Sequence, residues 1–191
     1  MRRISSKPLT LILLLCLAFP AVAQQRLTPE GAVRYFYQNA FHYQSHNMPD
    51  TAMMCIDVAL SIDSTFLPAL NLKGYIYEEH YADYEQAMRC YQRILSLDSS
   101  YLKAYLNIGH LYYLKRQYSE AKSHINKALA IDSTYADAYY NLGFIANEEN
   151  YGHQALAYMN KAIALGSQAA LKWMAWYEEQ RRIGAEENIE Q

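Results

Sequence analysis

A short pattern recurs along this chain at intervals of 34 or 35 residues. It ends three successive segments as Ile62-Asp63-Ser64-Thr65, Leu97-Asp98-Ser99-Ser100 and Ile131-Asp132-Ser133-Thr134, and a weaker form follows at Leu165-Gly166-Ser167. A fixed period of this size is typical of stacked supersecondary units, each of which needs its neighbours to bury an apolar face. The period therefore predicts a repeat architecture.

Each repeat contains two stretches with the spacing of an amphipathic helix. After residue 102, Tyr105, Ile108 and Tyr112 share one helical face, and Ala121 and Ile125 share another further on. The Asp-Ser-Thr segment then offers turn and capping groups for the next helix. We expect an all-α chain with a lead-in over residues 24–32 and helix-turn-helix repeats over residues 33–66, 67–101, 102–135 and 136–169.

Two columns of small residues repeat with the same period and would let the paired helices approach closely. They are Ala40, Gly74, Gly109 and Gly143 in the first helices, and Ala52, Ala87, Ala121 and Ala155 in the second. The pattern resembles the tetratricopeptide repeat, W-x2-L-G-x2-Y followed by A-x3-F and Pro. This resemblance implies a right-handed α-solenoid whose first helices line a concave, peptide-binding groove.

The segment after the fourth repeat continues the period for half a unit. Trp173 falls in the tryptophan column of the repeat, but Tyr177 falls where a small residue is needed for a second helix. Repeat stacks need a terminal element that covers the last apolar face. We therefore expect a capping helix over residues 170–182 and a flexible polar tail over residues 183–191.

The N-terminal residues 1–23 have the pattern of a secretory signal peptide. Arg2, Arg3 and Lys7 precede an apolar stretch over residues 9–20, and Ala21-Val22-Ala23 offers a cleavage site. The stretch is too short to favour a membrane span, which needs about 20 apolar residues. We expect cleavage after Ala23, a mature chain that does not span the membrane, and a location in a bacterial periplasm or outside the cell.

The charge balance of the chain narrows the classes of partner. Without the three basic residues of the signal segment, 14 Lys and Arg face 19 Asp and Glu, a net charge of −5. This balance argues against nucleic-acid binding, which depends on basic contacts to phosphate.

Cys55 and Cys90 are 35 residues apart and share a repeat column, so we expect two unpaired thiols.

The sequence offers no set of residues for catalysis. His42 and His46 are four apart on one helix, but they lack a third metal ligand and the Glu of the zinc-protease motif. The acidic pairs Glu78-Glu79 and Glu148-Glu149 are interpreted as solvated helix surface. No nucleophile, base and orienting group can be assigned. We expect no enzyme activity, no cofactor and no metal site.

Aromatic and amide side chains recur outside the packing columns, on the face that the resemblance assigns to the groove. The candidate binding residues are Tyr37, Phe41, Asn71, Tyr75, Lys103, Asn107, His110, Tyr113, Tyr140, Asn141 and Phe144, and Arg34 and Glu78 share their columns. Rings can bury side chains of an extended peptide while amides bond to its backbone. An ordinary amphipathic surface would also explain these residues.

The pattern favours a protein-binding scaffold that receives a peptide segment of another exported or envelope protein. One alternative is self-association, in which exposed apolar residues such as Met174 and Trp176 pair two capping helices in a homodimer. Another alternative is glycan binding, because aromatic rings also stack on sugars.

Overall fold

The computed structural model describes residues 28–187, and side chains as far as residue 183. The predicted signal peptide, residues 24–27 and residues 188–191 lie outside that range. Within it, every regular element is an α-helix: α2 (Pro29–Ser45), α3 (Pro49–Ile62), α4 (Leu67–Glu79), α5 (Tyr84–Leu97), α6 (Leu102–Leu114), α7 (Tyr118–Ile131), α8 (Ala136–Glu148), α9 (Gly152–Ala164) and α10 (Gln168–Glu187).

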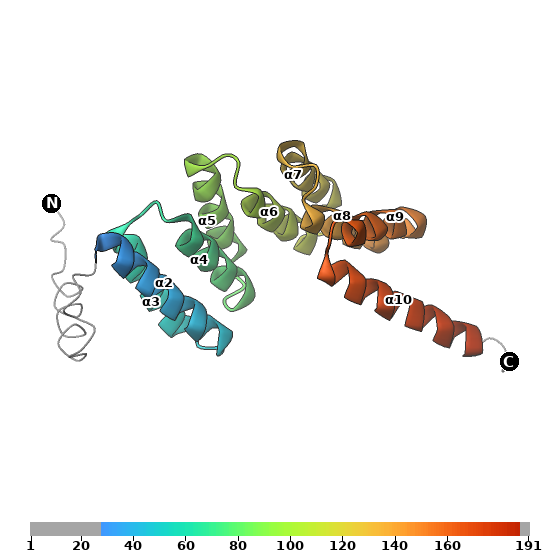
Figure 1. The fold of residues 1–191 in the computed structure, drawn as a ribbon, viewed down its shortest axis with the longest axis horizontal. Coiled ribbons are helices and arrows are strands. Elements are labelled where there is room, and N and C mark those ends of the chain that lie inside the picture. Colours follow the sequence, from blue (N-terminus) through green and yellow to red (C-terminus); the bar gives the residue numbers. More distant parts are fainter. Residues whose placement is uncertain (1–27, 188–191) are drawn as a thin grey trace. The chain divides into compact units, whose positions relative to one another are not determined.

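The helices form antiparallel hairpins within two compact units that divide after Leu97. The first unit pairs α2 with α3 and α4 with α5, and the second pairs α6 with α7 and α8 with α9 before α10 follows (Figure 1). The hairpins starting with α4, α6 and α8 begin at residues 67, 102 and 136. The helices therefore follow the sequence period, and the predicted all-α repeat class is confirmed.

The first helix begins where Thr28-Pro29-Glu30 indicates a helix start, and the end of the last helix differs from the prediction. Helix α2 begins at Pro29, because the Thr28 hydroxyl accepts a 3.1 Å hydrogen bond from the Gly31 backbone N–H and proline suits the first turn. Helix α10 continues to residue 187, so residues 183–187 of the predicted tail are helical. Glu, Gln, Arg and Ala favour helix even on a fully solvated surface, so polarity alone does not mark a helix end.

The column of small residues in the first helices lets the paired helices approach closely, as the sequence suggested. In three hairpins its glycine lies against a buried side chain of the second helix: Gly74 against Tyr91, Gly109 against Ile125 and Gly143 against Met159. A Cβ atom on these glycines would lie 2.5, 3.0 and 3.0 Å from the nearest atom of those side chains. The absence of a side chain thus sets how closely the two helices approach.

The Asp-Ser-Thr segments close turns and do not cap the next helix, which corrects the sequence interpretation. The Asp63 carboxylate accepts hydrogen bonds from the Thr65 N–H at 2.9 Å and from its hydroxyl at 2.7 Å. These bonds hold the pKa of Asp63 below its usual range. The helix that follows has Phe66 at its N-cap, without a side-chain cap bond. The same turn recurs at Asp98 and Asp132.

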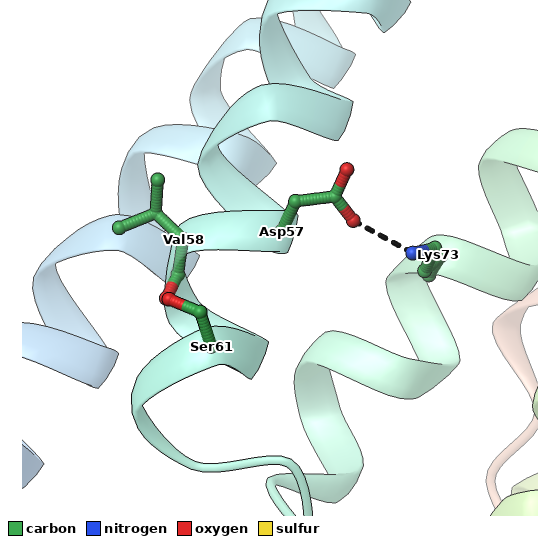
Figure 2. A network of polar contacts seen from close by, with 4 residues as sticks. All are labelled: Asp57, Val58, Ser61 and Lys73. Carbon is green, nitrogen blue, oxygen red and sulfur yellow. Dashed lines mark hydrogen bonds and ion pairs between the residues drawn. The ribbon is translucent and has the colours of Figure 1, made fainter. Parts of the chain in front are cut away.

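An ion pair links the two hairpins of the first unit. Figure 2 shows Lys73 of α4 reaching Asp57 of α3, with 2.6 Å between Nζ and Oδ1, while Ser61 bonds the Val58 carbonyl within α3. Burial lowers the pKa of Lys73, but the hydrogen bond and charge of Asp57 outweigh it, and the net change is a rise. The charged Lys73 is therefore accommodated in a partly buried position.

The last helix covers the final hairpin through one face. Trp173 and Ala170 of α10 are buried with Met159 and Ala162 of α9. The Trp173 ring stacks on Tyr177 with 5.0 Å between ring centroids. This packing is the arrangement expected of a capping helix.

Candidate functional site

Five predicted binding residues surround one cavity in the second unit. Helix α6 supplies His110 and Tyr113, and helix α8 supplies Tyr140, Asn141 and Phe144. The cavity holds about 160 Å³. Both helices are the first of their hairpins, so equivalent faces of successive repeats bring these side chains together. This clustering follows from the repeat period.

The cavity has an aromatic wall with defined ring contacts. Tyr113 of α6 meets Phe144 of α8 edge to face at 6.1 Å, and Tyr140 lies 5.9 Å from the same ring. His110 stacks on Tyr113 at 5.9 Å. Tyr113 packs partly against the core of α6, α7 and α8, and Tyr140 and Phe144 pack partly against the core that α10 covers. The rings are thus held in place before any ligand arrives.

Three further residues line the cavity, and none of them was a predicted binding residue. They are Gly109, Ile125 and Ile145. Gly109 has no side chain, and Ile125 of α7 packs against it, 3.0 Å from where a Cβ atom would lie. A glycine in the small column, with aromatic residues one turn away in two successive repeats, was the available signal for this pocket.

One nearby carboxylate acts on a tyrosine of the cavity. Burial, then the nearby Glu148 carboxylate, raises the pKa of Tyr113, and Arg116 opposes this to a smaller extent. No Asp, Glu, Lys or Arg is among the residues that line the cavity. Its polar groups are Asn141, His110 and the hydroxyls of Tyr113 and Tyr140. Such a site suits an apolar side chain flanked by backbone amides, a common composition for small binding pockets.

The remaining second-unit candidates, Lys103 and Asn107, lie on α6 outside this cavity. Of the first-unit candidates, Tyr37 packs edge to face on Phe66 at 5.5 Å, whereas Phe41 and Tyr75 are 56% and 39% exposed. Asn71 is partly buried on α4. The first unit has a cavity of about 370 Å³ lined by Pro29, Glu30, Val33, Arg34, Ile62, Asp63 and Phe66, which includes none of its four binding candidates.

The acidic pairs are not uniformly solvated, which corrects the sequence interpretation. Glu78 is 7% exposed and accepts a hydrogen bond from the Tyr91 hydroxyl, so it does not face a groove. Glu149 is partly buried and forms an ion pair with Lys122. In each pair the other carboxylate, Glu79 or Glu148, is exposed. The two members of each pair therefore have different roles.

Other candidate chemistry is limited within residues 28–187. No cluster of three metal-ligating side chains occurs there; the His46 Nδ1 lies 2.8 Å from the His42 carbonyl. Cys55 and Cys90 are free and partly buried, and burial raises the pKa of the Cys90 thiol to about 11. None of the described helices is long and apolar enough to cross a bilayer.

Comparisons with known proteins agree with this architecture. Sequence models of the tetratricopeptide repeat match residues 67–101 and 136–165, and a second repeat model matches residues 109–146. The chain thus carries tetratricopeptide repeats over these residues. The hairpin of α2 and α3, outside the matched ranges, has the same two-helix form. None of the curated proteins matches this chain in sequence.

Solved structures show the same fold at low identity. PilF of Pseudomonas aeruginosa aligns with a TM-score of 0.67 and 22% identity, covering 83% of this chain and 74% of PilF. PilW, a type IV pilus biogenesis factor, aligns with a TM-score of 0.66 and 23% identity over 78% of this chain and 69% of PilW. MamA aligns with a TM-score of 0.58 and 20% identity over 70% and 77%. At these identities the similarity concerns the fold alone.

Proposed function

We propose that this chain is a non-enzymatic interaction module that binds an extended peptide segment of a partner protein in the aromatic pocket between α6 and α8. The repeats and their structural neighbours support a protein–protein interaction scaffold. The observation that carries the finer proposal is the convergence of five predicted residues on one cavity. The pattern of residues 1–23 supports a partner that is itself exported or in the cell envelope.

The binding mode follows from the pocket. An apolar side chain would enter the cavity and pack against Tyr113 and Phe144, while the Asn141 amide can both donate to and accept from a peptide backbone. The rings are already fixed by core contacts, so little ordering cost falls on the module itself. Apolar anchors in preformed pockets commonly dominate the affinity of such interfaces.

Partner capture from an extract of the source cells tests this proposal. Phe144→Ala removes one wall of the pocket, and we expect capture to be lost while helicity measured by circular dichroism is retained. Tyr151→Ala is the matched control, because Tyr151 is 58% exposed and lies outside the pocket. Equal capture by wild type and Phe144→Ala would contradict the assignment of the pocket.

One observation favours a second function, self-association through α10. Trp176 is 55% exposed and Ile183, two turns later, is 38% exposed. Residues seven apart on a helix share a face, so both can lie on one surface stripe. A molecular-mass measurement over a range of concentrations tests this, and Trp176→Ala should shift a dimer to monomer. A monomer at all concentrations removes this function.

A further inference from the structure

An exposed carboxylate follows the aromatic wall of the pocket by one helical turn. Glu148 is four residues after Phe144 on α8, so the two side chains are neighbours on the helix surface. Glu148 is solvent-exposed, and its charge contributes to the raised pKa of Tyr113 across the pocket. An exposed negative charge therefore lies one helical turn from Phe144, an aromatic residue of the uncharged pocket.

The first unit contains the same combination. Tyr75 on α4 is exposed, and Glu79 follows it by four residues on the same helix. Burial, then the charges of Glu79 and Glu78, raises the pKa of Tyr75. Tyr75 and Phe144 occupy equivalent positions of the repeats that start at residues 67 and 136. Each unit thus presents an aromatic ring with an exposed carboxylate one turn away.

These two carboxylates are not used to stabilise the fold. Among the residues described by the structure, neither Glu79 nor Glu148 has an ion-pair partner. Their sequence neighbours contrast with them: Glu78 is buried against Tyr91, and Glu149 is paired with Lys122. The positive charge of Arg116 acts on Tyr113 less strongly than the negative charge of Glu148 does.

We propose that the segment bound by the pocket is basic, with an apolar side chain against Tyr113 and Phe144 in the cavity and a Lys or Arg beside Glu148. This inference rests on the proposed function and specifies the partner class. A cation there would meet a carboxylate with an aromatic ring one helical turn away, and both groups attract cations. The excess of acidic residues after position 23, 19 against 14, favours the same partner.

A synthetic peptide array tests the inference. Each peptide has a central Leu, Met or Phe in a Ser background. The residues within three positions of the centre define three flank classes, which carry Lys, Ser or Glu there. Wild-type protein should bind the Lys-flanked peptides most strongly. Fluorescence anisotropy in solution should then show that Glu148→Gln raises the Kd of the best peptide about three- to five-fold, the range of an exposed charge pair, and weakens its salt dependence.

Control variants separate the charge from the pocket. Glu120→Gln removes an exposed carboxylate of α7 outside the pocket and should leave the Kd unchanged. Glu148→Lys should shift the preference toward Glu-flanked peptides. Equal binding of the three flank classes, or no effect of Glu148→Gln, would overturn the basic-partner inference while the pocket stands. No binding to any peptide, or binding unaffected by Phe144→Ala, would overturn the proposed function itself.

Discussion

The Tyr91 hydroxyl donates a 3.0 Å hydrogen bond to the Glu78 carboxylate, joining α5 to α4 inside the first unit. Tyr91 is fully buried. Its ring also occupies the space beside Gly74, whose Cβ would lie 2.5 Å from the Tyr91 Cε1 atom. The Tyr91 side chain therefore both occupies the space beside Gly74 and donates a hydrogen bond to a buried carboxylate.

This contact predicts that Gly74→Ala destabilises the first unit. The added methyl group would collide with a ring that is buried and hydrogen-bonded, so overpacking should cost about 1–3 kcal/mol. Gly152→Ala is the control, because a Cβ there meets nothing within 4 Å and alanine favours helix. Urea unfolding measures both, and equal stability of the two variants would contradict the packing.

The same tyrosine predicts a loss of stability at alkaline pH. Burial and the charge of Glu78 raise the pKa of Tyr91 well above its usual range, whereas in the unfolded chain it is about 10. The unfolded chain releases the proton first, so this stabilising contribution is complete below about pH 10 and falls by up to about 1.4 kcal/mol per pH unit above it.

Tyr91→Phe isolates this effect. At neutral pH the variant should lose about 1–3 kcal/mol, because the buried Glu78 loses a donor. Above pH 10 the difference from wild type should narrow, since phenylalanine has no proton to release. Urea unfolding at a series of pH values checks this, and a constant difference from pH 8 to pH 11 would rule out the titration of Tyr91 as the cause.

The ion pair of the second unit should contribute more than an exposed one. Lys122 Nζ lies 2.9 Å from both oxygens of Glu149, whose side chain is 20% exposed. Glu149→Gln should cost about 1 kcal/mol, at the upper end for accessible pairs. Glu85→Gln breaks the exposed Arg89 pair and should cost less. Thermal unfolding at low and high salt tests this order of the two stability losses. A larger loss for Glu85→Gln than for Glu149→Gln would contradict it.

The two tryptophans of α10 should differ strongly in their contribution to stability. Trp173 is 8% exposed and stacks on Tyr177, whereas Trp176 is 55% exposed. Trp173→Ala should cost about 3–5 kcal/mol as a large core truncation, whereas Trp176→Ala should change stability by less than about 0.5 kcal/mol. Each variant keeps one tryptophan, so fluorescence can follow unfolding. Similar losses would mean that α10 caps the stack through another face.

The local regularities were predictable because the period acts on every repeat at once. The helix pairs, the small column and the capping role of Trp173 depend on spacing and residue size alone. The extent of α10 was not predictable in this way, because polar residues such as those of its last turns occur equally in solvated helices and in tails. The signal segment lies outside the described residues and remains a prediction.

The candidate site was also predictable from the sequence only in part. The sequence placed His110, Tyr113, Tyr140, Asn141 and Phe144 on first-helix faces, and the structure shows that these five surround one cavity. It could not separate them from the remaining candidates, because shared periodicity does not reveal which side chains converge.

By itself the sequence determined the repeat, the helix pairs and the faces on which aromatic and amide residues fall, because these depend on spacing along one chain. Only the tertiary structure decided which carboxylate of each acidic pair is buried. Glu78 lies against Tyr91 of the partner helix, and Glu148 stays in solvent beside the pocket. Adjacent residues on a helix point in different directions, so the packing of the neighbouring helix assigns their roles.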